Sequence, residues 1–156
     1  MKNYLQKKLN NEKGMTLIEL LAVIVIIAII AAIAIPSIGN IIENSRYSAV
    51  KADATNVISA ANIYFTENGE KTKVPVSVLQ SQGFLDNAGK IPVTVVGTET
   101  APTNNFVEKT TTGLKITTTA IEYSGTKKLT FTGASVNGIN AHPGKGSEAG
   151  PHTINQ

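Results

Sequence analysis

The chain has 156 residues, with 14 basic and 11 acidic side chains and no cysteine. This length suits one small domain, and the lack of cysteine excludes disulfides, thiolate zinc sites and thiol nucleophiles. The formal charge of +3 belongs to residues 1–14, which hold four lysines and one glutamate, because the rest of the chain carries ten basic and ten acidic side chains. The positive charge therefore describes the N terminus and does not indicate an acidic partner for the remainder.

A basic leader, residues 1–14, precedes an apolar segment, residues 15–36. From Met15 to Ile35 only Thr16 and Glu19 are not hydrocarbon, and about 20 apolar residues span a bilayer core. We therefore expect a helix that crosses a membrane, with the leader lysines on the cytoplasmic side. Glu19 is out of place there, because an ionised group at membrane depth costs at least about 2.5 kcal/mol unless it finds a partner or a proton.

The helical pattern continues over residues 37–67. Pro36, aided by Gly39, predicts a kink rather than an end, because its ring clashes with the carbonyl four residues earlier. Apolar residues then recur at three- and four-residue steps, and Asn68-Gly69 ends the helix. The expected apolar stripe is Ile38, Ile41, Ile42, Ala49, Val50, Ala54, Val57, Ile58, Ala61, Tyr64 and Phe65, and the expected polar side is Glu43, Asn44, Arg46, Lys51, Asp53 and Asn56.

Residues 68–140 are expected to form a small β-rich domain. A loop with a short helical turn at 70–90 leads to segments rich in Val, Ile, Thr and aromatic residues, which predict strands. Because the core of a domain of about 70 residues supplies only a few kcal/mol, we expect the helical stripe to complete that core. The predicted strands are 91–96, 106–110, 113–123 with a bulge near Ala120-Ile121, and 127–132 after a hairpin turn at Ser124-Gly125.

The predicted fold class is α+β, a long N-terminal helix packed on a small antiparallel sheet. Residues 141–156 contain repeated Gly and Pro and little that could be buried, so they predict a flexible tail. Within this segment, residues 144–147 do not form a phosphate-binding loop, because the required Gly and Ser/Thr positions are not met. His142 and His152 are interpreted as solvated tail residues rather than metal ligands.

The junction Lys-Gly-Met-Thr-Leu-Ile-Glu at residues 13–19, between a basic leader and an apolar run ending in Pro36, resembles the prepilin signature of type IV pilins and pseudopilins. The resemblance covers residues 1 to about 66 and implies a pilin-like fold. It further implies that prepilin peptidase cuts between Gly14 and Met15 and N-methylates Met15. Phe is commoner than Met at that first position in the family, so Met15 is a departure from the pattern.

The same resemblance implies a structural subunit rather than an enzyme, with identical subunits, the membrane and a pilus assembly machinery as partners. The precursor would lie in the cytoplasmic membrane with its N terminus in the cytoplasm, and the mature chain would join a surface filament. Cleavage would create an amine at Met15, one helical turn or about 6 Å from Glu19. A neighbouring subunit shifted by one turn would bring its amine level with this Glu19, so Glu19 is the expected assembly residue.

Several alternatives remain open at this stage. The filament could be an adhesive or motile pilus, a competence pilus that takes up DNA, or a type II secretion pseudopilus. Nucleic acid is an uncertain partner, because Lys127-Lys128 is the only basic pair outside the leader and is too small for an electrostatic binding surface. A single-span surface anchor is a different class. A secretory signal peptide cut after Ala34 would need a shorter apolar run than the 16 residues from Leu20 to Ile35. We expect no catalytic residues, no metal and no cofactor.

Overall fold

The computed structural model describes residues 2–94, 97–98 and 101–155, with side chains from Thr16 onward. It contains two compact units, Met1–Asn40 and Ile41–Gln156. One helix, α1 (Lys2–Glu67), belongs to both and includes Pro36. The predicted helix over residues 15–67 is therefore confirmed. It also extends into the leader, which the sequence analysis had not assigned to any secondary structure.

The first unit is a helical segment whose apolar side chains are not covered by the residues that the structure describes. Its large hydrophobic residues between Leu17 and Ile35 are 52% to 71% exposed. By length and composition, α1 is the one helix among the described residues that could cross a membrane, and none of its apolar window is buried. A contiguous apolar surface of this size marks a segment that lipid or other protein must cover.

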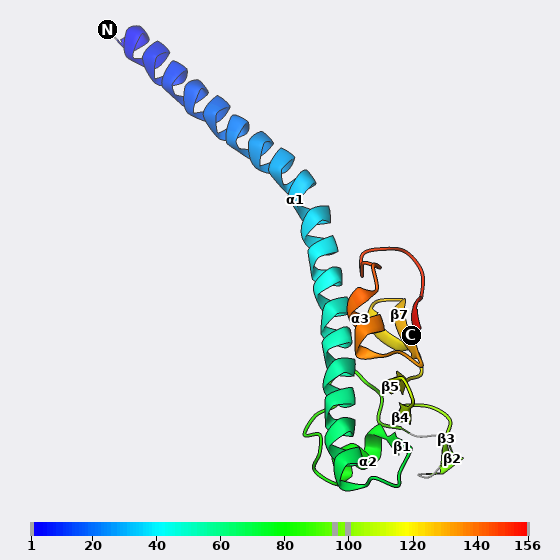
Figure 1. Cartoon of the computed structure of the whole chain (residues 1–156). Helices are drawn as coiled ribbons and strands as arrows, with labels where there is room; N and C mark the ends of the chain where they lie inside the picture. The colour runs from blue at the N-terminus through cyan, green and yellow to red at the C-terminus, as the bar shows by residue number, and fades with distance from the viewer. Residues whose placement is uncertain (1, 95–96, 99–100, 156) are drawn as a thin grey trace. The chain divides into compact units, whose positions relative to one another are not determined.

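The second unit combines the rest of α1 with short strands and helices (Figure 1). Its elements after α1 are β1 (Lys73–Pro75), α2 (Val76–Ser81), β2 (Gly97–Thr98), β3 (Ala101–Pro102), β4 (Phe106–Thr110), β5 (Gly113–Thr117), β6 (Ile121–Ser124), β7 (Lys127–Thr132), α3 (Val136–Ala141) and β8 (His152–Asn155). A first sheet has the antiparallel order β1-β4-β5, and another has the order β6-β7-β8, with β8 parallel to β7. An isolated bridge between Ile116 and Ala134 links these two sheets, and β2 and β3 form a separate antiparallel pair.

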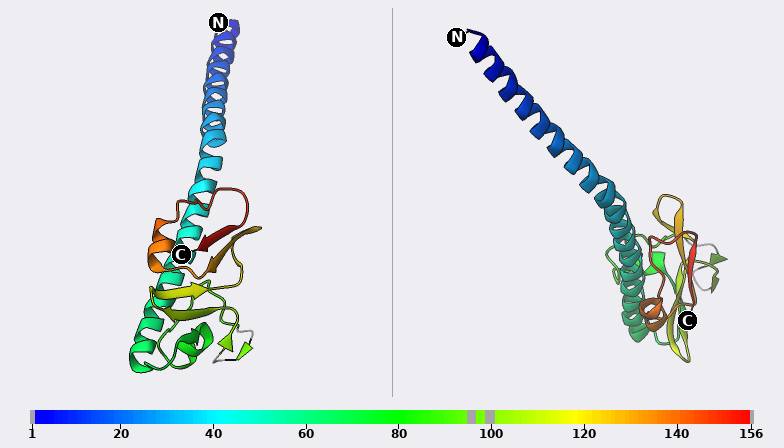
Figure 2. Two further views of the ribbon diagram at one scale, coloured as in Figure 1. Left: turned by 45° about the vertical axis from the view of Figure 1, so that its right-hand side comes forward. Right: turned by 90° about the horizontal axis from the view of Figure 1, so that it is seen from above.

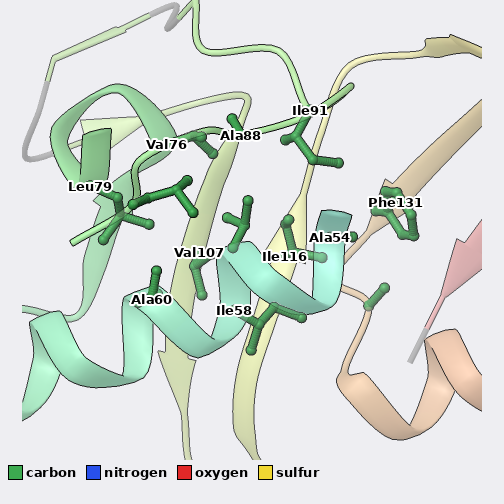
Figure 3. Packing of buried hydrophobic residues seen from close by; sticks show 14 of the residues in the cluster. Ala54, Ile58, Ala60, Val76, Leu79, Ala88, Ile91, Val107, Ile116 and Phe131 are labelled. Atoms are coloured by element: carbon green, nitrogen blue, oxygen red, sulfur yellow. The ribbon is translucent and has the colours of Figure 1, made fainter. Parts of the chain in front are cut away.

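The core of this unit lies between α1 and the sheets. Ala54 and Ile58 of α1 face Val107 and Ile116 of the first sheet, as Figure 3 shows. Small alanines on this face let the helix approach the strands closely, so the expected packing of helix on sheet is confirmed. The buried residues of α1 are Tyr47, Val50, Ala54, Val57, Ile58, Ala60, Ala61, Tyr64 and Phe65.

The limits of the expected helical stripe need correction. Its first members are exposed, and burial begins only at Tyr47, which the sequence analysis had left out of the stripe. Glu43 and Asn44, one turn earlier, are only half-buried, and among the described residues the second unit first covers a side chain of α1 completely at Tyr47. The expected members that stay exposed are Ile38, Ile41, Ile42 and Ala49.

Two of the predicted strands, 106–110 and 127–132, coincide with β4 and β7. The hairpin turn at Ser124-Gly125 is also confirmed, since Ser124 pairs with Lys127 and Gly125 adopts φ +55°. The strand expected at 91–96 is not present over residues 91–94, and residues 95–96 lie outside the described part of the chain. This apolar stretch instead places Ile91 in the core.

The single strand predicted over 113–123 is in fact two strands in different sheets, β5 and β6. Side-chain hydrogen bonds hold the intervening residues: Thr118 Oγ1 accepts from Phe131 N, and Asn105 Oδ1 accepts from Thr119 N at 2.9 Å. Asn105 is fully buried and adopts φ +49°, a conformation that Asn tolerates better than most residues. The register irregularity lies between Glu122 and Ser124 rather than at Ala120-Ile121.

The prediction of a flexible tail over residues 141–156 needs the largest correction. The last residue of α3 is Ala141, and β8 lies beside β7 in register, with Phe131 opposite Ile154 (Figure 2). Ile154 is fully buried. One apolar residue in a favourable register, together with backbone pairing, is sufficient to order the segment, and its polar, Gly-rich composition does not reveal this.

Residues 142–151, here called the strap, cross α1 on their way to β8. Ser147 N donates to Asn44 Oδ1 at 2.9 Å, and Lys127 Nζ donates to Ser147 O at 2.9 Å while pairing with Glu43 Oε2 at 2.7 Å. A Cβ at Gly146 would collide with the backbone carbonyl of Glu43. Glu43 and Asn44, expected on a solvated polar face, thus anchor the strap.

Replacing Ile154 by Ala tests whether the C terminus is packed. We expect the free energy of unfolding of the second unit to fall by about 2 to 5 kcal/mol, because a fully buried Ile loses its contacts and leaves a cavity. The matched control is Ile63→Ala on α1, where the side chain is 55% exposed, with an expected change within about 0.5 kcal/mol. Urea unfolding of the detergent-solubilised chain, followed by near-UV circular dichroism, measures both. Equal, small effects would contradict a packed β8.

Candidate functional site

The predicted cleavage site lies inside α1. Gly14 and Met15 both have helical backbone, whereas the side chain of Met15 lies outside the described residues. A helix places residues four apart on one face, about 6 Å apart along the axis. The backbone thus brings position 15 and Glu19 to the same face, one turn apart, as the spacing predicted.

Glu19 stands alone on an apolar surface. Its side chain is exposed, as are those of Leu17, Ile18, Leu20 and Leu21 around it. None of the side chains that the structure describes forms a hydrogen bond or an ion pair with its carboxylate. A carboxylate at membrane depth needs a partner or a proton, and the described residues supply no partner for Glu19.

A family model described as the prokaryotic N-terminal methylation motif matches residues 9–35, a range that includes Gly14, Met15 and Glu19. The chain carries the prepilin-type signal. This signal supports a type IV pilin-like or pseudopilin protein, implies processing by prepilin peptidase, and indicates a structural protein. Together with the exposed apolar helix it indicates a membrane-anchored precursor. No curated protein and no solved structure matches the chain significantly.

The expected kink residues both lie just beyond the matched range, residues 9–35. Both Pro36 and Gly39 are within α1, whose helical backbone continues past them. Nothing lies within 4 Å of a Cβ added at Gly39, so packing does not require a glycine at this position. The kink itself stays a prediction.

A second cluster of polar aromatic side chains gathers where the strap crosses α1. The rings of Tyr47, Tyr123 and His152 form a triangle, with the centroid of Tyr47 5.4 Å from Tyr123 and 5.2 Å from His152. The Tyr47 hydroxyl lies 2.9 Å from His142 Nδ1. Both histidines are half-buried, which corrects their interpretation as solvated tail residues. Their nearness could not be seen in the sequence, although Tyr47 does lie three residues before Val50 on the buried helical face.

The cluster has the chemistry of a packing contact. Burial raises the pKa of Tyr47 to about 12, with further contributions from the neighbouring Tyr123 phenol and the Glu148 carboxylate, so its phenol stays neutral. Burial lowers the pKa of His142, and the positive charges of Lys51 and His152 lower it further, against an opposing effect of Glu148. Neutral His142 accepts from Gly144 N at 3.2 Å and from Tyr47.

The cluster offers no ionised nucleophile near neutral pH, because burial and the charge of Glu43 also raise the pKa of the Tyr123 phenol. Within the described residues no group of three or more His, Cys, Asp or Glu side chains could hold a metal ion. The arrangement therefore positions the strap on the helix, and the N-terminal signal remains the candidate functional site.

Acidification should loosen this contact. Because the pKa of folded His142 lies below the ordinary 6.5, the folded state binds fewer protons than the unfolded one, and stability falls as pH decreases from about 6.5 through the folded pKa. We expect the urea midpoint of the second unit to fall between about pH 7.5 and 5. The fall should be smaller in His142→Gln, which cannot titrate. An identical pH profile for both proteins would contradict this role of His142.

Proposed function

We propose that this protein is the structural subunit of a type IV pilus-like filament. The precursor lies in the cytoplasmic membrane with its leader in the cytoplasm, is cut between Gly14 and Met15 and methylated on Met15, and is assembled through its N-terminal helix into a surface filament. The observation that carries the proposal is the prepilin-type signal at residues 9–35. It coincides with an exposed apolar helix and a carboxylate that lacks a partner among the described residues.

The apolar half of α1 supports assembly by helix packing. Its residues can exchange lipid contacts for contacts with the same helix of other subunits, since lipid tails and leucine-type side chains are equally apolar. Small residues permit close approach of helix backbones, and the segment contains four alanines between positions 28 and 34: Ala28, Ala31, Ala32 and Ala34. The assembly machinery that the family resemblance implies would supply the energy for extraction.

The charge of Glu19 supports a defined register between subunits. Cleavage creates a protonatable amine on Met15, and methylation preserves its charge. The amine of a subunit displaced by one turn lies level with the Glu19 carboxylate of its neighbour. Pairing removes the penalty of an unpaired buried charge, which is several kcal/mol per ion. The pair between subunits forms only on assembly, so it can set the register of the filament through one contact.

The processing step can be tested by mass spectrometry of the mature protein. We expect loss of residues 1–14 and one methyl group on the amine of Met15. Gly14→Val should leave the full-length precursor in the membrane, because a β-branched side chain beside the scissile bond blocks access of the peptidase. Gly39→Val is the matched control and should be processed as the wild type is. A mature N terminus at any other residue would contradict the assignment of Gly14 and Met15.

The register contact can be tested with Glu19→Ala and the isosteric Glu19→Gln. Both variants should be cleaved, and both should fail to form filaments, since neither carries the charge that pairs with the Met15 amine. Glu122→Gln removes an exposed carboxylate on β6 and should assemble normally. Electron microscopy of material sheared from cells, with immunoblots for the processed subunit, gives the readout. Abundant filaments from Glu19→Ala would refute the assembly role.

A further inference from the structure

Two basic side chains line one hollow on the second unit and have no acidic partner there. Arg46 of α1 and Lys90 of the loop after α2 border a cavity of about 370 Å³, together with Ala49, Val50 and Tyr123. Both side chains are exposed, and neither forms an ion pair with a described residue. Two like charges that share a hollow favour an anion between them.

The walls of this hollow are held in place by other contacts. The Tyr123 hydroxyl donates to Gly146 O at 3.1 Å, which fixes its ring. Lys90 lies between buried Ala88 and Ile91, and its backbone N donates to Asp53 Oδ2 at 2.8 Å. The nearby carboxylate of Asp53 is thus bonded to the backbone of the loop. An arginine side chain such as that of Arg46 can bind a carboxylate through two parallel hydrogen bonds.

A complementary hollow lies at the end of α1. Glu67 and Glu70 border a second cavity of about 270 Å³ with Asn68, Gly69 and Lys71. Both carboxylates are exposed and form no ion pair with any described side chain. The two carboxylates and the Lys71 ammonium together give this hollow a net charge of −1. By contrast, the carboxylates of Glu43 and Glu108 are already paired with lysines.

We propose that Glu67 and Glu70 of one copy of this chain bind in the Arg46–Lys90 hollow of a second copy, an inference that rests on the proposed filament. Positions 46 and 67 are 21 residues apart on α1 and thus about 32 Å apart along its axis. A parallel copy displaced by that distance brings its acidic hollow level with the basic one. Different patches meet in such a contact, which does not close on itself and therefore propagates as a fibre.

This contact differs in kind from the pairing of Glu19. It lies on the solvated surface of the second unit, so salt should weaken it, since exposed charges are screened within about 8 Å at physiological ionic strength. It also joins copies about 32 Å apart along the axis, whereas the Met15 amine and Glu19 join copies one helical turn apart. The surface contact would therefore determine which more distant subunits of the filament touch each other.

A charge exchange tests the contact in intact cells. The basic variant set is Arg46→Glu with Lys90→Glu, the acidic set is Glu67→Lys with Glu70→Lys, and the exchange variant carries all four. We expect each set alone to lower the yield of sheared filaments at least about tenfold, because like charges then face each other. The exchange variant should recover most of the yield. Lys109→Glu with Lys115→Glu is the control for net charge and should assemble as the wild type does.

The outcomes separate this inference from the filament proposal. Wild-type yield from either set alone would overturn the inference. So would loss in both sets without recovery in the exchange variant, because the two hollows would then not pair with each other. Membrane levels and peptidase processing of each variant are compared with wild type, and lower yield from a properly processed variant supports the contact. If the wild-type chain forms no filaments while Glu19→Ala behaves identically, the proposed function itself fails.

Discussion

The packing of one face of α1, from Tyr47 to Phe65, against two small sheets is the contact on which the rest of this protein depends. Without that face the sheets have too little apolar surface to stay folded, because a domain of about 70 residues buries a core worth only a few kcal/mol. In turn, the C-terminal half of the helix is held by its packing in the folded unit. The same continuous helix can then carry an apolar segment, which no described part of the chain covers, to a membrane or to other subunits.

The strap shows how this unit compensates for its size without disulfides. Lys127 joins Glu43, 84 residues earlier in the chain, to the backbone carbonyls of the strap, and Ser147 N reaches Asn44 across 103 residues. Gly146 permits the chain to touch the helix backbone. These contacts hold β8 against β7 and close the core at the first buried turn of α1. The histidine and tyrosine rings beside them are best understood as part of that closure.

Charge is distributed on α1 according to the environment of each segment. In the apolar half a single carboxylate, Glu19, stands among residues suited to lipid, where an unpaired charge is costly and a partner has a large effect. In the solvated half, charged residues are common and each ion pair contributes little. The contact that we propose at Glu19 would therefore set a strict register, and the contact that we propose between Arg46 and Glu67 would be weaker and adjustable.

The sequence by itself determined the elements that depend on neighbouring residues. Three- and four-residue periodicity predicts α1, β-type composition predicts β4 and β7, the Ser124-Gly125 turn predicts the hairpin, and residues 9–35 carry a recognisable signal. Only the tertiary structure decided where the chain between β5 and β6 changes sheet, where burial of α1 begins, and that the polar C terminus is ordered. These features arise from hydrogen bonds and packing between residues far apart in the chain, which local patterns do not encode.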